Sequence, residues 1–283
     1  RFWAGSSLMR PTFGSVSSVA TLSHEAVKRR LSEIVVGSRV IVSVAGAADP
    51  DAVIRQVGDI FGSLPRGELA VCDLPDTEPG RYMQSFPVHQ IHFCLGLPWV
   101  GLKDERYLTG ALCSALLGGS VSSRLFQLVR EERGLAYDIH SALDAYSNCG
   151  GLLISGATEA RHVNETVAIV LRELAKLRSL GVKDSELDRA RNMMISQLTM
   201  DCDGIGARMW RALESEAVYG RYVSADELIE RVRGISSNIC NDFLTLFLEK
   251  PQAVFAITGY VEDLRFESSI EAFCEDGKLD SLL

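Results

Sequence analysis

At 283 residues, of which 47% are hydrophobic and 23% charged, the chain is long enough to bury a large core and too apolar to be disordered. Its net charge of −8 offers no basic surface, so we expect no nucleic-acid partner. The longest apolar runs reach about half of the roughly 20 residues that a membrane helix needs, so we expect a soluble protein without a membrane span.

The first part of the chain alternates between helical and strand periodicity. Apolar residues at helical spacing predict one helix over residues 15–34, and strict alternation predicts a strand over residues 40–46. Asp49 is a good N-cap and Pro50 is tolerated at the first helical position, so another helix should begin there. Residues 65–80 are rich in proline, glycine and acidic side chains, which indicates a linker.

The middle of the chain carries the most informative segment. Gly118 and Gly119 should end a helix, because glycine adopts a left-handed cap at little cost. Ser122 or Ser123 can cap the next helix, and Gly134 should stop it. The helix predicted between these signals carries an arginine in its last turn.

A strand should follow, because the apolar period changes to two at Ala136. In a regular strand Tyr137 would share one face with Ile139, while Asp138 would point to the other face. Arg130 ends the preceding helix, so it should lie near Tyr137 at the start of the strand. Further strands are expected at 88–97, 151–157 and 253–259, and further helices at 106–117, 160–180, 187–200, 205–219, from Ser224 and at 239–248.

The sequence contains a weak internal repeat, in which positions 213 residues apart correspond, as Val19 and Val232 do. Residues 19–23 align with 232–236, and residues 42–46 with 255–259, so a helix and a strand keep register in both copies. If the second copy begins near residue 80, the first copy should begin about 130 residues before Arg1.

Known catalytic motifs are absent from the sequence, which has no H-E-x-x-H, H-x-x-E-H, G-x-S-x-G or Walker loop. His89 and His92 are the closest pair of histidines, but residues three apart on a strand point to opposite faces. The seven cysteines are scattered and never form a C-x-x-C pair, which indicates reduced, structural thiols. We therefore predict no catalytic residue and no metal ligand in this chain. Reduced thiols favour the cytoplasm, with the periplasm and an organelle matrix left open.

Residues 118–137 read GGSVSSRLFQLVREERGLAY, and this run resembles the C-terminal half of the insulinase/pitrilysin family of zinc metallopeptidases, the inverzincins. Bacterial zinc proteases and mitochondrial processing peptidase are the members that it resembles most. Shorter similarities extend over residues 1–265, among them RPTFGS from Arg10, VAGAADP from Val44 and YGR from Tyr219.

The resemblance implies an α+β fold in which two homologous half-domains, each an antiparallel sheet backed by helices, enclose a peptide. Residues 1–65 would be the end of a truncated first, N-terminal half-domain, and residues 66–80 a linker. Residues 81–265 would form the complete second half-domain, and residues 266–283 a tail.

The same resemblance assigns roles to particular residues. The family's zinc motif, H-x-x-E-H, belongs to the first half-domain, and the repeat places it before Arg1. Zinc is therefore expected in the missing N-terminal half or in a partner subunit. The second half-domain of the family contributes an arginine and a tyrosine seven positions apart that bind the substrate backbone. Arg130 and Tyr137 match these positions, and their side chains are suitable hydrogen-bond donors to a developing oxyanion.

Three functional hypotheses follow from the resemblance. The first is the substrate-binding C-terminal portion of a bacterial-type zinc metalloendopeptidase that cleaves extended peptides and is inactive without the zinc motif. The second is a naturally zinc-less subunit that contributes Arg130 and Tyr137 to a zinc-bearing sister chain. The third is a structural core protein without catalysis. The expected partners are a peptide substrate and either the N-terminal half-domain or a sister subunit, in a homo- or heterodimer.

Overall fold

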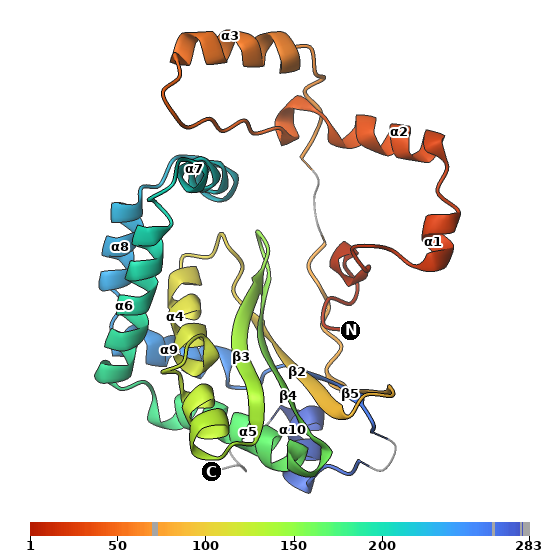
Figure 1. The fold of residues 1–283 in the computed structure, drawn as a ribbon, viewed down its shortest axis with the longest axis vertical. Coiled ribbons are helices and arrows are strands. Elements are labelled where there is room, and N and C mark those ends of the chain that lie inside the picture. The colour runs from red at the N-terminus through yellow and green to blue at the C-terminus, as the bar shows by residue number, and fades with distance from the viewer. Residues whose placement is uncertain (70–72, 262–263, 278, 280–283) are drawn as a thin grey trace.

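A computed structural model describes residues 1–69, 73–261, 264–277 and 279 of the chain (Figure 1). The larger part, from β1 (Gly80–Ser85) onward, is a sheet covered by helices on one face, and the N-terminal helices stand apart from it. Parts of the predicted linker and tail, residues 70–72 and 280–283, lie outside the described residues. No helix within the described ranges is long and apolar enough to cross a membrane.

The N-terminal segment folds into α1 (Val16–Ala20), α2 (His24–Ile34) and α3 (Pro50–Phe61), with the short turns η1 (Ser7–Met9) and η2 (Gly37–Arg39). The single helix predicted over residues 15–34 is wrong. Its chain breaks before Ser23, whose side chain accepts a hydrogen bond from the Ala26 amide at 3.1 Å and so begins a new helix. The start of α3 is confirmed, with Asp49 as the N-cap and Pro50 in the first turn.

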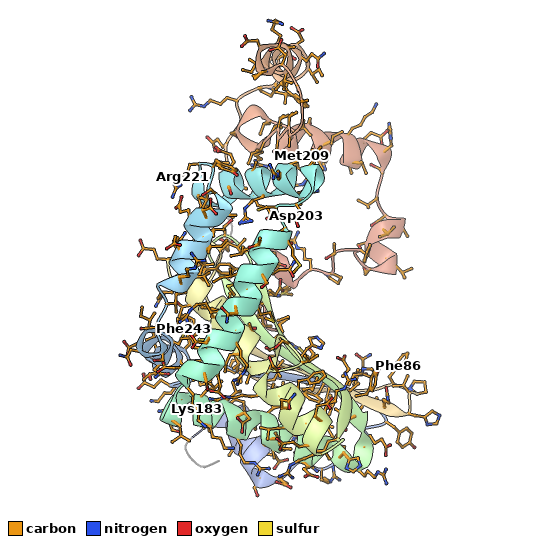
Figure 2. All side chains as sticks on the ribbon, turned by 60° about the vertical axis from the view of Figure 1, so that its left-hand side comes forward. Phe86, Lys183, Asp203, Met209, Arg221 and Phe243 are labelled. Atoms are coloured by element: carbon orange, nitrogen blue, oxygen red, sulfur yellow. The ribbon has the colours of Figure 1, made fainter. Side chains whose placement is uncertain are left out.

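The strand predicted over residues 40–46 does not form. A strand needs a neighbour to complete its ladder of hydrogen bonds, and no described strand lies beside this segment. The segment instead runs near α7 (Ile205–Tyr219), where the Ser43 hydroxyl donates to the Met209 carbonyl oxygen at 2.8 Å (Figure 2). The sequence of this segment alternates as a strand would, but the described structure contains no strand with which it pairs.

Five strands form one sheet in the order β1-β5-β2-β4-β3. Their bounds are β1 (Gly80–Ser85), β2 (Gln90–Trp99), β3 (Ala136–Ala145), β4 (Gly150–Glu159) and β5 (Val254–Gly259). All neighbours are antiparallel except β1 and β5, which run parallel. The predicted α+β architecture, a sheet backed by helices, is confirmed. The sheet is mixed rather than wholly antiparallel, because β1 joins its edge alongside a strand from the far end of the chain.

Helices cover one face of the sheet in the described part of the chain (Figure 1), whereas the other, open face carries the ring of Phe2 against Gly96 and Gly151. On β2, Ile91, Phe93 and Leu95 are buried against the helices, whereas His92 on the opposite face is exposed. The hydrophobic core therefore lies between the sheet and its helices. These are α4 (Tyr107–Gly118), η3 (Phe126–Glu132), η4 (Ala160–His162), α5 (Val163–Leu180), α6 (Asp184–Met200), α8 (Ala225–Arg233), α9 (Ser237–Phe247) and α10 (Ser268–Asp276), with α7 at the far end of α6.

Candidate functional site

The segment that carries Arg130 is η3, a π-helix rather than a regular α-helix. Leu125 and Val129 are fully buried and hold it against the sheet. The helical segment begins directly after Ser123, as predicted, and the Ser123 carbonyl oxygen accepts from the Gln127 amide at 3.0 Å. The Ser123 hydroxyl donates to the Ser120 carbonyl oxygen at 2.6 Å instead of accepting from a helix amide. The predicted stop is confirmed: Gly134 has a φ of 61°, and its amide donates to the Arg130 carbonyl oxygen at 3.1 Å. Arg130 therefore sits at a defined helix end.

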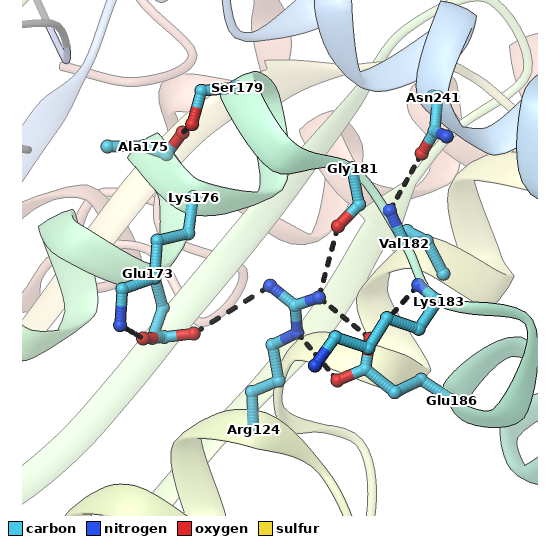
Figure 3. Close-up of polar contacts among 10 residues, drawn as sticks. All are labelled: Arg124, Glu173, Ala175, Lys176, Ser179, Gly181, Val182, Lys183, Glu186 and Asn241. Atoms are coloured by element: carbon cyan, nitrogen blue, oxygen red, sulfur yellow. Dashed lines mark hydrogen bonds and ion pairs between the residues drawn. The ribbon is translucent and has the colours of Figure 1, made fainter.

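Arg124 fixes η3 to the helices behind it (Figure 3). Its guanidinium makes two hydrogen bonds to Glu186, at 2.7 and 3.1 Å, and one to the Gly181 carbonyl oxygen at 3.1 Å. Glu173, whose side chain is 5% exposed, lies 3.8 Å away and is also held by Lys176 at 2.7 Å. Burial raises the pKa of Glu186, but the hydrogen bonds and charge of Arg124 outweigh this, so that its pKa is lowered. The network locks the base of η3.

A β-bulge places Tyr137 at the start of β3. Ala136 pairs with Thr158 and Asp138 pairs with Ala157, so Tyr137 is the extra residue between them. Its side chain is 80% exposed, whereas Ala136 and Ile139 are buried. The prediction that Tyr137 shares a face with Ile139 is therefore wrong, because the bulge interrupts the alternation that a regular strand would keep.

Arg130 and Tyr137 lie side by side. The guanidinium carbon of Arg130 is 4.4 Å from the centroid of the Tyr137 ring and 4.7 Å from that of Phe126. Glu131 is an exposed ionic neighbour at 3.7 Å, which leaves donors of the guanidinium for other partners. The Tyr137 hydroxyl has no hydrogen bond to any residue that the structure describes. Two side chains that can donate hydrogen bonds thus meet at an exposed position.

The charges around this pair are themselves paired. Arg133 binds Glu165 at 2.7 Å, which joins the end of η3 to α5. On the open face of β3, the Nδ1 atom of His140 lies 3.2 Å from the Asp138 carboxylate. Arg130, by contrast, makes its contacts chiefly with the aromatic rings of Phe126 and Tyr137.

The residues in this structure do not fit a zinc ion. Within residues 1–69, 73–261, 264–277 and 279, no three or more His, Cys, Asp or Glu side chains are grouped so that they could hold a metal. His140 and Asp138 make only a pair. His89, one of the two histidines considered from the sequence, precedes β2, while His92 lies within it on the open face.

Two further residues, Arg124 and Phe126, belong to the site and were not among the site residues predicted from the sequence. Phe126 stands four residues before Arg130, a spacing that brings side chains together on one helical face, so the stacking could have been anticipated. Arg124 directly precedes the apolar residues Leu125 and Phe126, where a charged side chain requires a partner. Its partners, Glu173 and Glu186, lie about 50 and 60 positions further along the chain, and no local pattern identifies them.

Comparison with known proteins gives consistent matches. A sequence family described as "Peptidase M16 inactive domain" matches residues 21–194. The uncharacterized zinc protease YmxG of Bacillus subtilis is 29% identical over 254 residues, which cover 87% of this chain and 62% of YmxG. An uncharacterized zinc protease of Streptomyces coelicolor is 29% identical over 240 residues, covering 81% of this chain and 52% of that protein. The chain thus spans between half and two thirds of the length of these relatives.

Solved structures share the fold. A peptidase M16 inactive domain from Pseudomonas fluorescens has a TM-score of 0.79 at 19% identity and covers 90% of this chain and 62% of its own. A chain of complex III2 from Candida albicans has a TM-score of 0.81 at 16% identity, covering 94% of this chain and 66% of its own. At these identities the likeness concerns the fold alone.

Proposed function

Because this chain belongs to the peptidase M16 inactive-domain family, we propose that it is the substrate-binding, C-terminal portion of a zinc metalloendopeptidase. The family expected from residues 118–137 is thus confirmed, and the role of the chain within it is our inference. The observation that supports this role most strongly is the contact between Arg130 and Tyr137 at an exposed helix end.

Arg130 and Tyr137 are proposed to bind the backbone of an extended peptide next to the bond that is cleaved. A guanidinium offers five N–H donors in a planar fork, and stacking against Phe126 and Tyr137 restricts its orientation. The Tyr137 hydroxyl adds a donor from the neighbouring strand. Positioned donors of this kind stabilise the charge that develops on a peptide carbonyl oxygen during hydrolysis.

Zinc is proposed to be held outside this sequence, by an N-terminal half-domain or by a sister subunit. The described residues offer no suitable ligand group, so no chemical step is assigned to a metal bound by this chain. In this proposal Arg130 and Tyr137 orient the peptide, and the remaining chemistry is contributed by the partner half.

Residues 1–65 are proposed to be the end of that first half-domain, with residues 66–80 as a linker, 81–265 as the second half-domain and 266–283 as a tail. This tail contains α10, which packs on the core of the second half-domain through Ile270 and Phe273. The support is the lack of any buried residue in α1, α2 and α3. Val16, Ile54 and Ile60 are between 67% and 92% exposed on these helices. Exposed apolar side chains in this number indicate that α1, α2 and α3 pack against further protein. We propose that this is the rest of the first half-domain.

A naturally zinc-less subunit in a two-chain peptidase would use the same two residues toward a sister chain. A structural homologue without catalysis would not use Arg130 or Tyr137. Mutation of either residue would then leave peptide cleavage unchanged, which distinguishes this case. The open reading frame before Arg1 separates the first two cases, because H-x-x-E-H there places the zinc in the same polypeptide.

The experiment measures cleavage of an unfolded fluorogenic peptide by the 283-residue chain, first alone with added zinc and then together with its zinc-bearing half. We expect no chelator-sensitive cleavage by the chain alone and cleavage by the assembly. In the assembly, Arg130→Ala should lower kcat/KM about 100-fold or more. The matched control is Arg133→Ala, a neighbouring arginine whose partner is Glu165. Equal activity of the two variants would reject the proposal.

A further inference from the structure

The bulge that places Tyr137 is anchored by β4 on both of its sides. Opposite the two steps of β4 from Thr158 to Gly156, β3 takes three steps, from Ala136 to Ile139. One residue of β3 is therefore in excess within this interval, and Tyr137 is that residue. The contacts that fix the two ends of the interval thus also fix where Tyr137 points.

A buried hydrogen bond from Thr158 holds the end at which the chain enters β3. The Thr158 hydroxyl donates to the Leu135 carbonyl oxygen at 2.6 Å, and Thr158 is only 2% exposed. The Leu135 amide in turn donates to the Val129 carbonyl oxygen at 2.9 Å. Leu135 is therefore bonded both to the helical segment that carries Arg130 and to the strand that lies opposite the bulge.

Apolar packing holds the other end of the interval. Ile139 lies over Gly156, where an added Cβ would come within 3.0 Å of the Ile139 Cδ1 atom and 2.8 Å of the Phe93 ring. Ile139 is buried, so it cannot turn outward without exposing its side chain to water. The bulge at Tyr137 is thus confined between a hydrogen bond on one side and a close apolar contact on the other.

The hydroxyl of Thr158 stands at a position where the strand otherwise buries apolar side chains. Leu152 and Ile154 point to the same face of β4 and pack in the core. Valine has the shape of threonine and no polar group to bury, so stability alone does not call for a hydroxyl here. Its acceptor belongs to Leu135, in the segment between Arg130 and Tyr137, which favours a role in placing these two side chains.

We propose that Thr158 is a positioning residue: through Leu135 it fixes the bulge and so directs the Tyr137 hydroxyl toward the substrate. This role rests on the proposed function of Arg130 and Tyr137. Because the Tyr137 ring is exposed, its place depends on the backbone that carries it. A donor that moves by about 1 Å loses much of its effect on the reacting carbonyl group, and removal of the Thr158 hydroxyl frees the backbone for such a movement.

The test measures steady-state kinetics of Thr158→Val in the complete assembly. We expect kcat to fall about 10-fold while KM stays within about 2-fold, because the Tyr137 hydroxyl acts on charge that develops in the transition state. Thr158→Ser keeps the hydroxyl and should retain about half or more of the parent kcat. Thr166→Val is the matched control, since Thr166 is also buried but its hydroxyl donates within α5, to the His162 carbonyl oxygen at 2.8 Å.

Two further measurements separate positioning from a general loss of stability. In a Tyr137→Phe background, the addition of Thr158→Val should lower kcat about 3-fold or less, because the hydroxyl that it directs is already absent. In the 283-residue chain alone, Thr158→Val should speed hydrogen exchange of residues 135–139 about 10-fold. Exchange in the centre of β4 should stay unchanged, and mass spectrometry of peptic fragments measures both regions.

A kcat of Thr158→Val equal to that of Thr166→Val would overturn the proposal. So would a 10-fold loss that persists in full in the Tyr137→Phe background, which would show a general effect of about the same size on any variant. Thr158→Ala removes the same hydroxyl if Thr158→Val does not fold. Normal cleavage by Tyr137→Phe itself would reject the proposed function, whereas impaired cleavage by Tyr137→Phe with normal cleavage by Thr158→Val would reject the role of Thr158 alone.

Discussion

The guanidinium carbon of Arg130 lies 4.4 Å from the ring centroid of Tyr137, although the two residues belong to different elements. The bulge in β3 makes this contact possible, because it turns Tyr137 away from the core while Ala136 and Ile139 remain buried. The Arg124 network holds the other side of the contact by fixing the base of η3. Both donors are therefore supported by buried structure while their polar atoms remain accessible.

Tyr137→Phe should lower kcat/KM of the assembled peptidase about 10- to 100-fold, because it removes the hydroxyl but keeps the ring that stacks on Arg130. Since the ring is 80% exposed, the melting temperature should stay within about 1 °C of the parent value. Steady-state kinetics and thermal unfolding measure the two quantities. Tyr222→Phe is the control, because Tyr222 is also exposed and is not among the residues that contact Arg130. A loss of activity equal to that of the control would contradict the role of the hydroxyl.

Gly118→Ala should destabilise the chain by about 1–3 kcal/mol, because its Cβ would come within 2.5 Å of the Ser141 amide nitrogen, where α4 packs on β3. Gly206→Ala makes the same chemical change in the first turn of α7, where nothing lies within 4 Å. It should be neutral or stabilise by up to about 1 kcal/mol, since alanine favours helix. Urea unfolding of both variants gives the comparison, and equal effects would show that the close approach at Gly118 is not rigid.

Glu186→Gln should destabilise the chain by about 1–2 kcal/mol at pH 7, because it removes the carboxylate that Arg124 binds. The folded state lowers the pKa of Glu186 below its ordinary value of 4.5, so its contribution is fully present above that pH. As the pH falls through the lowered pKa, the difference from the parent chain should disappear. Glu230→Gln, at a side chain that is 70% exposed, should show little difference at any pH. A pH-independent gap for Glu186→Gln would exclude the ion pair as its cause.

The amides of α1, α2 and α3 should exchange hydrogen rapidly in the isolated chain, because none of their residues is buried. Addition of the zinc-bearing half should slow this exchange if these helices complete a first half-domain. The amides of β2 and β4, in the centre of the sheet, serve as an internal reference that should exchange slowly in both states. Mass spectrometry of peptic fragments measures both regions, and slow exchange of α3 in the isolated chain would argue against the proposed division.

Local signals in the sequence predicted the elements whose ends depend on neighbouring residues. Asp49 and Pro50 start α3, Ser224 accepts the Glu227 amide at the start of α8, and Gly134 ends η3. Capping depends on a few adjacent side chains, so a single sequence contains the information. The strands β3 and β4 were also found, because their apolar alternation is uninterrupted over most of their length.

Features that depend on distant partners were not predicted. The side of the sheet to which Tyr137 points depends on the register of β3 against β4. A one-residue bulge reverses that side, and the apolar alternation of the sequence does not reveal the bulge. β1 has no apolar alternation and forms because β5, more than 160 residues later, lies beside it. Residues 40–46 show the opposite case, in which a good strand pattern has no described neighbour to pair with. The proximity of Arg130 and Tyr137 was expected from their spacing. The stacking of the Arg130 guanidinium on the rings of Phe126 and Tyr137 was not predicted and is seen only in the structure.

A double-mutant cycle on Arg130 and Tyr137 in the assembled peptidase tests the central claim most directly. Arg130→Ala, Tyr137→Phe and the double variant are compared by kcat/KM on one extended peptide. We predict that both single changes impair cleavage and that the double variant is less than 10-fold worse than the more impaired single one, because the two donors act on the same part of the substrate. Unchanged kcat/KM in all three variants would contradict the claim that these residues bind the substrate.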